Sequence, residues 1–346
     1  MLVVLAMAGA IWGLGYAMKM PRVARLYMIG LLYVAVLAAH VVLPDGHPLR
    51  AATGDTAAPW LIIGILGGLG YAYSLVLGRV RSRAQAKERA QAPALDPGKF
   101  ADGELDRYAR HIVLRELGGP GQARMRKGRV LVVGAGGLGS PALLYLAAAG
   151  VGTIGVIDDD VVDSANLQRQ VIHRDAGIGM PKVFSAEAAM TALNPYVTIR
   201  PYNRRLTADI AGDLFDDYDV ILDGSDSYDT RAIVNAAAVA RGKPVVAGAL
   251  GQWDGHVTVF DPAQGAPCYA CLYPQKPAEG LAPSCAEAGV FGPLPGVIGS
   301  MMAVEAAKLL SGAGTPLLGA MLVYDALEGE TRRIKAARNP GCPVCG

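Results

Sequence analysis

Two patterns of apolar positions divide the chain. Near the amino terminus, almost uncharged stretches occupy residues 1–18, 23–43 (or 26–43) and 60–78. Each has the length needed to cross a hydrocarbon core of about 30 Å, so this pattern predicts three transmembrane helices. From residue 129 onward, short apolar runs that end in glycine alternate with segments of helical periodicity. This second pattern predicts a separate α/β domain.

The α/β pattern is regular enough to place its elements. Five β-rich runs of the buried type follow one another as RVLVVGAG, TIGVID, VTIRPYN, DVILDGS and PVVAGAL. Helical segments fall between them at 138–150, 182–193, 208–215 and 229–241. Such alternation is typical of a parallel sheet with helices on both faces. A strand HVTVFDP, a helix at 295–311 and strands MLVYDA and ETRRIK come next and predict an antiparallel extension.

Charge supports the same division. Residues 1–92 carry nine Lys/Arg and three Asp/Glu, and the other 254 residues carry 23 and 27, so the net charges are +6 and −4. The apolar share of 52% and the charged share of 18% therefore come from a membrane segment beside an ordinary domain. A domain of net charge −4 is a poor nucleic-acid binder. We expect a membrane anchor over 1–80, a charged linker over 81–100 and a catalytic domain over 101–346.

Loop charges predict the orientation in the membrane. Lys19, Arg22 and Arg25 lie in the first connection, and RVRSRAQAKER follows the third apolar stretch, whereas the second connection has one Arg against two Asp. Because positive loops stay in the cytoplasm, the amino terminus is expected outside and the catalytic domain in the cytoplasm, at the inner membrane. The alternative for residues 1–18 is a signal peptide, but a basic start and a clear cleavage site are lacking.

A glycine-rich turn follows the first strand of the α/β domain. The run VLVVGAGGLGS has glycines at 134, 136, 137 and 139, directly before a predicted helix. Glycines there let backbone N–H groups approach a phosphate at a helix amino end, which is the dinucleotide-binding pattern of a Rossmann-like fold. About twenty residues later the next strand ends in Asp158, Asp159 and Asp160, where a ribose-binding carboxylate belongs. The default ligand is therefore a nicotinamide or flavin dinucleotide.

Other residues favour a triphosphate instead. NLQRQ places Asn166, Arg169 and Gln170 after the acidic strand end, and GMPK places Lys182 at the start of the next helix. Asp226 follows the fourth strand, at the carboxyl end of the strand, where ligands bind. Two fixed cations and a carboxylate suit a triphosphate with magnesium better than a dinucleotide pyrophosphate. Each cation alone is also compatible with a solvated surface charge.

Four of the five cysteines form two CxxC pairs, Cys268 with Cys271 and Cys342 with Cys345. Four thiolates at such spacing suit a tetrahedral Zn²⁺ that ties the carboxy terminus to an earlier loop. The alternative is a redox dithiol or disulfides, which a reducing cytoplasm disfavours. Cys285 is left over in the loop PSCAEAGVFGP. His173 and His256 have no partner spacing and are expected to be structural.

Several motifs occur in an order that resembles a known family: RYARHIVL, VLVVGAGGLGS, DDDVVDSANLQRQ, GMPK, DGSD…R, two CxxC pairs and CAEAGVFGPLPGVIGS. From about residue 105 to 346 the chain resembles the ThiF/MoeB/HesA family, the bacterial relatives of ubiquitin-activating enzymes. The resemblance implies a homodimeric adenylyltransferase that uses ATP and Mg²⁺. Its substrate would be the C-terminal glycine of a ubiquitin-like sulfur carrier ending in Gly-Gly.

The resemblance also implies roles for individual residues. Asp160 would hold the ribose, Asn166, Arg169 and Lys182 the phosphates, and Asp226 the Mg²⁺. Arg110 would reach the phosphates of the neighbouring subunit, and Cys285 can take the activated carrier as a thioester or related adduct. The family often has Asn where this chain has Ser227, which leaves one secondary contact open. The same resemblance implies structural zinc at the paired cysteines.

Other function classes stay open at this point. An NAD(P)-binding oxidoreductase fits the glycine turn alone. An adenylating enzyme for a peptide or a tRNA base keeps the ATP chemistry, although tRNA-modifying relatives tend to lack paired CxxC motifs. A membrane-tethered binding module without catalysis is disfavoured by the joint presence of Arg110, Arg169, Lys182 and Asp226.

Overall fold

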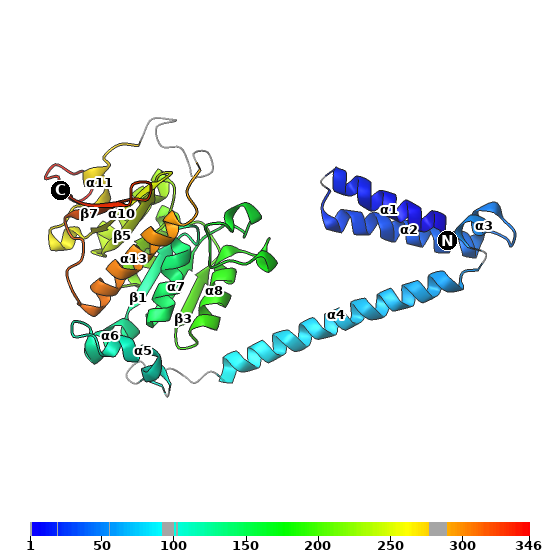
Figure 1. Ribbon diagram of the computed structural model, residues 1–346, viewed down its shortest axis with the longest axis horizontal. Coiled ribbons are helices and arrows are strands. Elements are labelled where there is room, and N and C mark those ends of the chain that lie inside the picture. Colours follow the sequence, from blue (N-terminus) through cyan, green and yellow to red (C-terminus); the bar gives the residue numbers. More distant parts are fainter. Residues whose placement is uncertain (1, 19, 55, 92–99, 102, 277–288) are drawn as a thin grey trace. The chain divides into compact units, whose positions relative to one another are not determined.

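The computed structural model describes residues 2–18, 20–54, 56–91, 100–101, 103–276 and 289–346. The chain separates into two compact units, which are Met1–Ala94 and Leu95–Gly346 (Figure 1). We call them the amino-terminal unit and the α/β unit. Cys285 lies outside the described residues, so its predicted role remains a prediction.

The amino-terminal unit consists of helices α1 (Leu2–Ala17), α2 (Arg22–Val42), α3 (Pro48–Thr53) and α4 (Ala58–Gln91). Three helices meet where Val4, Val36 and Trp60 are buried together. The Tyr33 hydroxyl of α2 donates to the Trp60 carbonyl of α4 at 2.8 Å. A Cβ at Gly64 would lie 2.1 Å from that hydroxyl oxygen, so this glycine permits the close approach of α2 and α4.

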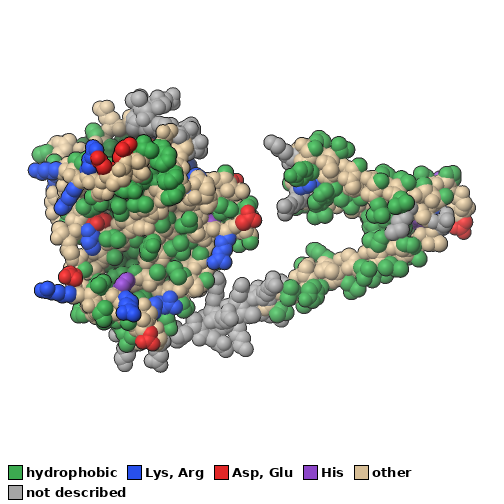
Figure 2. All heavy atoms as spheres, in the orientation of Figure 1, with side chains coloured by type: hydrophobic (Ala, Val, Ile, Leu, Met, Phe, Trp, Pro, Cys, Tyr) green, Lys and Arg blue, Asp and Glu red, His purple; other side chains and the backbone are tan. Residues whose placement is uncertain are grey.

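Two helices of this unit, α2 and α4, contain long apolar segments that are mostly exposed. Segments Val23–Val42 of α2 and Ala58–Leu77 of α4 have 20 residues each, and only 17% and 6% of their hydrophobic windows are buried. Figure 2 shows the hydrophobic side chains that cover these helices. A third helix of sufficient length and apolarity, Leu294–Ser311, is 50% buried inside the α/β unit. Helix α1 has 16 residues and is shorter than the predicted span; it rises about 24 Å.

Helix α4 also differs from the expected boundary. It continues to Gln91, through part of the region expected to be a linker. Residues 79–91 contain only helix formers such as Ala, Arg, Gln, Lys and Glu apart from Val80 and Ser82, with neither Gly nor Pro to end a helix. Residues 81–91 of the expected linker are therefore helical.

The α/β unit is built on one eight-stranded sheet with the order β3-β2-β1-β4-β5-β6-β7-β8. The parallel strands are β1 (Arg129–Val133), β2 (Thr153–Ile157), β3 (Thr198–Tyr202), β4 (Val220–Asp223) and β5 (Val245–Leu250). The antiparallel strands are β6 (Asp254–Phe260), β7 (Ala320–Asp325) and β8 (Glu330–Lys335). The predicted mostly parallel sheet with an antiparallel C-terminal extension is confirmed.

Helices cover both faces of the sheet, each over its own hydrophobic core. One core lies beneath α7 (Gly139–Ala149), α8 (Lys182–Leu193) and α13 (Leu294–Ser311). The other lies beneath α9 (Ala208–Asp216) and α10 (Tyr228–Arg241). The chain runs from β1 to β2 and β3, then returns to β4 beside β1. The order reverses between β1 and β4, and this switch point is where doubly wound sheets bind ligands.

Two helices before the sheet, α5 (Glu104–Ile112) and α6 (Gly118–Lys127), were not predicted. A buried ion pair joins them, with Arg126 Nε 2.8 Å from Glu104 Oε1 and side chains that are 7% and 1% exposed. The second carboxylate oxygen of Glu104 accepts the Ala101 N–H at 2.8 Å. Because breaking a buried pair leaves an uncompensated charge, this contact fixes α5, the helix that carries Arg110.

Candidate active site

The glycine turn leaves β1 and enters α7 in a conformation that requires glycine. Gly134 has φ +94°, in the left-handed region that side chains disfavour. A Cβ at Gly139 would lie 1.9 Å from the Gly134 carbonyl oxygen. Gly136 and Gly137 line the adjoining cavity, at the amino end of α7. The four glycines therefore bring backbone within reach of a ligand at a helix amino terminus, where anions are favoured.

Both backbone polar groups of Ala135, inside this turn, form hydrogen bonds. Its N–H donates to Asp158 Oδ2 at 2.7 Å, and its carbonyl accepts from His173 Nε2 at 2.9 Å. The other ring nitrogen, Nδ1, lies 3.0 Å from Ser185 Oγ at the start of α8. His173 is thus structural, as predicted, and it connects the glycine turn with the helix that carries Lys182. Burial lowers the pKa of His173, which keeps the ring neutral.

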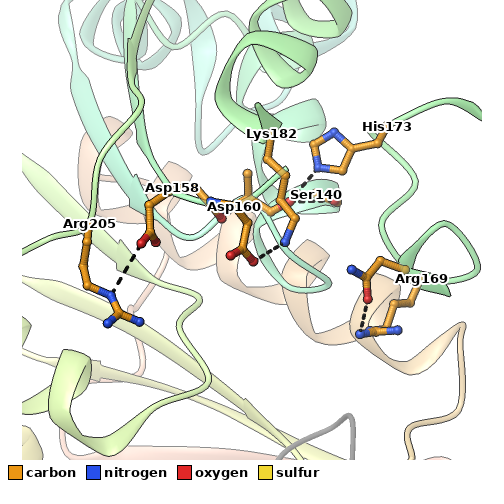
Figure 3. Close-up of polar contacts among 10 residues, drawn as sticks. Ser140, Asp158, Asp160, Arg169, His173, Lys182 and Arg205 are labelled. Carbon is orange, nitrogen blue, oxygen red and sulfur yellow. Dashed lines mark hydrogen bonds and ion pairs between the residues drawn. The ribbon is translucent and has the colours of Figure 1, made fainter. Parts of the chain in front are cut away.

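The three aspartates after β2 have different surroundings. Asp158 uses both oxygens on backbone N–H groups, of Ala135 and of Asp160. Asp159 faces Arg205, whose Nε lies 3.7 Å from Oδ2. Asp160 Oδ2 accepts from Lys182 Nζ at 2.7 Å (Figure 3). The Lys182 side chain is 5% exposed and the Asp160 side chain 69%, so a nearly buried ammonium group points at a solvent-facing carboxylate.

Arg169 lies on the far side of the glycine turn, after the short helix Ser164–Asn166. Its guanidinium donates to Asn166 Oδ1 at 2.7 Å. Arg169 and Gln170 line the cavity, whereas Asn166 is a positioning contact behind Arg169. The buried Oε1 of Gln170 has no hydrogen-bond partner among the residues that the structure describes. A buried, unpaired amide oxygen in a cavity wall is the kind of group that a polar ligand satisfies.

The end of β4 supplies the acidic side of the cavity. Asp223 turns inward, where its Oδ1 accepts from the N–H and hydroxyl of Ser225 at 3.0 and 2.6 Å. This turn leaves Asp226 exposed on the cavity wall. Ser227, the residue that departs from the family pattern, caps α10 by accepting the Thr230 N–H at 3.2 Å. A carboxylate at this position suits Mg²⁺, which prefers oxygen ligands.

These groups surround a cavity of 620 Å³ at the carboxyl ends of the parallel strands. Five basic and four acidic residues line it, namely Arg169, Lys182, Arg204, Arg205 and Arg231 with Asp158, Asp159, Asp160 and Asp226. The volume and the mixed charge fit a nucleoside triphosphate with a divalent cation. The sequence-based prediction thus named residues that the structure brings together, although it left out Arg204, Arg205 and Arg231.

Arg231 ends the motif DGSD…R, and the sequence alone indicates no role for this arginine. Its guanidinium donates to the carbonyls of Ser225 and Gly248, both at 2.7 Å, and so joins the ends of β4 and β5 beneath Asp226. His256, expected to be structural, also lines the cavity and lies 3.3 Å from the Tyr273 hydroxyl through Nε2. Burial lowers the pKa of His256, and the nearby Arg231 charge lowers it further. Only the pairing of β5 with β6, which the linear pattern cannot show, places this histidine there.

Arg110 is the predicted phosphate-binding residue that this cavity does not contain. It lies exposed on α5 and is not among the lining residues. Arg110 therefore does not contribute to the cavity of its own subunit as the structure describes it. The prediction that it serves a neighbouring subunit remains a prediction.

The paired cysteines come together at the carboxy terminus. All four sulfur atoms lie within 4.8 Å of one another, with separations of 3.6 Å between Cys268 and Cys342 and 3.5 Å between Cys271 and Cys345. Sulfurs arranged tetrahedrally at 2.3 Å from Zn²⁺ are about 3.8 Å apart, whereas a disulfide needs about 2 Å. The donor set therefore fits a structural zinc ion.

The surroundings of the four cysteines also favour a bound metal ion. Burial raises the pKa of the Cys268 thiol to about 12, because a thiolate loses its hydration there. A divalent cation compensates for this loss by supplying positive charge. Asn235 of α10 donates from Nδ2 to Cys268 Sγ at 3.7 Å and accepts the Tyr269 N–H at 2.8 Å, which orients the first sulfur ligand.

The fold and the cavity define a doubly wound α/β domain with a charged switch-point site and a four-cysteine cluster. A family model described as the ThiF family matches residues 108–344, and the chain belongs to this family. A sulfur carrier protein adenylyltransferase of Thermus thermophilus is 51% identical over 72% of this chain and 93% of that protein. A molybdopterin-synthase adenylyltransferase of Escherichia coli is 44% identical over 72% and 99%.

Solved structures agree on the fold. A crystal structure of Escherichia coli MccB with ATP superposes with a TM-score of 0.59 and 22% identity, and covers 70% of this chain and 74% of MccB. At this identity the likeness shows a common fold. The matched region excludes the amino-terminal unit, which lies before residue 108.

Proposed function

We propose that the α/β unit adenylates the C-terminal glycine of a ubiquitin-like sulfur carrier, and so activates it for sulfur transfer. The observation that carries this proposal is the convergence of Arg169, Lys182, Asp160 and Asp226 on one cavity at the switch point. The relatives named for the same activity cover nearly the whole α/β unit. The carrier is the expected partner, and no nucleic-acid partner is proposed.

In the proposed reaction, a carboxylate oxygen of the carrier attacks the α-phosphorus of ATP. The bond between that oxygen and phosphorus forms, the bond to the bridging oxygen breaks, and pyrophosphate leaves with the electron pair. Because the attacking carboxylate is already ionised, no general base is required. The barrier is mostly the approach of two anions, so positioning and fixed positive charge supply the catalysis.

The residues of this chain divide these tasks. The glycine turn offers backbone N–H groups to the phosphates, and Arg169 and Lys182 offer positive charge. The Asp160 carboxylate would accept a hydrogen bond from a ribose hydroxyl, which would free Lys182 to contact the triphosphate. Gln170 Oε1 would accept a hydrogen bond from the nucleotide. Asp226 would help to hold Mg²⁺, which would supply positive charge to the phosphates.

Two further parts of the proposal concern assembly. A homodimer would bring the partner subunit's Arg110 to the phosphates, and Arg110 does not line the cavity of its own subunit. An apolar groove of 480 Å³ lies between α5, α6, α7 and α13, beside the helix that carries Arg110. Exposed apolar side chains such as Tyr145 and Val304 gather there, and Figure 2 shows hydrophobic side chains on the face formed by α7 and α13. Zn²⁺ at the four cysteines would have a structural role.

The amino-terminal unit is proposed to anchor the enzyme in the inner membrane as a multi-pass segment of α1, α2 and α4. The exposed apolar surfaces of α2 and α4 support this proposal, and the loop charges favour a cytoplasmic location for the α/β unit. A reporter fused after Arg89 should behave as cytoplasmic, and one inserted near Gly54 as external. The opposite labelling would contradict the orientation.

Mass analysis of the carrier tests the activity. The full chain, Mg-ATP and candidate carriers ending in Gly-Gly are incubated together, and a carrier that gains one AMP identifies the substrate. The same carrier without its last glycine should gain none. An NAD(P)-dependent oxidoreductase is the second candidate because of the glycine turn; stabilisation by NAD(P) and not by Mg-ATP would favour it.

A further inference from the structure

Arg25, in the first turn of α2, is enclosed by α1 to an unusual degree for an arginine. Only 6% of it is exposed. Its guanidinium carbon lies 4.5 Å from the ring centroid of Trp12 and 5.8 Å from that of Tyr16. A Cβ at Gly15 would lie 2.7 Å from Arg25 Cγ, so the glycine makes room for the aliphatic stem. Helix α1 is therefore shaped to receive this side chain.

The charge that α1 encloses is not neutralised within the described chain. The buried Nε of Arg25 has no hydrogen-bond partner, and the described residues offer its side chain no ion pair. Residues 1–44 contain neither Asp nor Glu. The Nε of Arg50, in the same unit, also has no hydrogen-bond partner among the described residues, but the guanidinium of Arg50 has Asp45 at 2.7 Å and the Leu43 carbonyl at 3.0 Å. Cation–π contacts with aromatic rings offset only part of the cost of burying a guanidinium. We therefore expect an anionic group from outside the chain to contact Arg25.

The position of Arg25 indicates where this acceptor comes from, given the membrane anchor proposed above. The residue lies in the first turn of α2, close to the α1–α2 connection, and Trp12 and Tyr16 lie in the last turns of α1. Tryptophan and tyrosine concentrate at the level of lipid headgroups. The planar guanidinium matches phosphate oxygens in a two-pronged hydrogen-bonding geometry.

We propose that Arg25, seated on Trp12 and Tyr16, binds the phosphate of an acidic glycerophospholipid in the cytoplasmic leaflet. Lys19 precedes α2 and Arg22 begins it, and residues 1–44 contain no acidic residue. This excess of positive charge disfavours choline or ethanolamine headgroups, whose own cations would be repelled. The site would keep the enzyme in patches of anionic lipid and fix the depth of α2.

The test uses the full chain reconstituted with phosphatidylcholine alone or with phosphatidylcholine mixed with phosphatidylglycerol. Flotation with neutral vesicles is measured first. Failure to float contradicts the membrane anchor, whereas flotation without lipid selectivity contradicts only the headgroup site. The lipid retained by the protein in mild detergent is then measured by mass spectrometry. The wild type should retain phosphatidylglycerol well above its share in the membrane.

Variants locate the selectivity. Arg25→Gln should lower phosphatidylglycerol enrichment by about fivefold, the contribution of one basic residue at an anionic surface. Arg25→Lys should lower it by less, because the charge remains and the two-pronged geometry is lost, and this variant carries the test if Arg25→Gln does not insert. Arg50→Gln is the matched control and should behave as wild type. Equal enrichment in wild type and both Arg25 variants would overturn the proposal, as would displacement of the lipid by inorganic phosphate.

Discussion

Lys182 Nζ lies 2.7 Å from Asp160 Oδ2, and the lysine side chain is almost wholly buried while the aspartate is mostly exposed. The two groups predicted to bind different parts of ATP thus contact each other. Proposed nucleotide binding replaces this contact by two others, with the ribose at Asp160 and the phosphates at Lys182. The ion pair keeps a buried ammonium group ready at the site without leaving it unpaired.

Replacing this ammonium group tests its part in the reaction. Lys182→Met should reduce adenylate formation by about 10²–10³-fold, the usual loss when one fixed charge or donor at a reacting phosphate is removed. It should also reduce the rise in melting temperature that Mg-ATP causes. Lys243→Met is the control, because Lys243 donates to the Tyr218 carbonyl and does not line the cavity. Equal activity of the two variants would show that Lys182 is only a structural partner of Asp160.

The cysteine cluster predicts about one zinc ion per chain. Cys342→Ser combined with Cys345→Ser should lose this zinc, as measured by elemental analysis of the purified protein. The melting temperature should also fall, by roughly 5 °C or more, since metal binding contributes to folding and each kcal/mol corresponds to about 2–4 °C in a domain of this size. A stoichiometric disulfide in protein purified from the cytoplasm, with no zinc, would contradict the assignment.

His173 predicts a pH dependence of stability. Burial lowers the pKa of His173 in the folded chain, and the Lys182 charge lowers it further. The unfolded chain, with a histidine pKa of about 6.5, binds the proton first as the pH falls. The free energy of unfolding should therefore decrease below about pH 6.5, until the folded-state pKa is reached. Because the pKa of His256 is lowered as well, His173→Gln should remove part of this slope in urea titrations. If His173→Gln keeps the full slope, burial does not lower the pKa of His173 in the folded chain.

Cys285 is predicted to act after adenylation. A thiol adds nothing to acyl-adenylate formation, which depends on charge and positioning, but a thiolate can attack the activated carboxyl group. Cys285→Ser should therefore keep ATP–pyrophosphate exchange and lose any thiol-sensitive covalent adduct with the carrier. Full sulfur loading of the carrier by this variant would show that the enzyme's part ends at the adenylate.

Local sequence signals predicted the α/β unit well because each buried strand and each helix carries its own periodicity. Lys182–Leu193 and Glu330–Lys335 have the predicted bounds, and Gly139–Ala149 differs by one residue at each end. Helices α5 and α6 were missed because their apolar positions are few: α6 reads GGPGQARMRK, and its buried residues include Gln122 and Arg126. Such helices form through tertiary contacts such as the Glu104–Arg126 pair.

The site was predictable to the extent that its residues follow single strands. Asp160 and Asp226 come directly after β2 and β4, and Lys182 begins α8. Arg231 and His256 reach the cavity from α10 and from the antiparallel β6, so their place depends on how the sheet is assembled. The different roles of the three aspartates also depend on the folded geometry. Only the structure shows that both carboxylate oxygens of Asp158 accept hydrogen bonds from backbone N–H groups.

Carrier-dependent ATP–pyrophosphate exchange tests the central claim most directly, because it reports the reversal of the proposed adenylation step. With a carrier ending in Gly-Gly, the wild type should exchange labelled pyrophosphate into ATP, and exchange should vanish when the terminal carboxylate is blocked as an amide. Asp226→Ala should abolish exchange with the fold intact, and Asp229→Ala, which removes an exposed aspartate paired with Lys276, should not. Exchange that persists with the amide, or is undiminished in Asp226→Ala, would contradict the account.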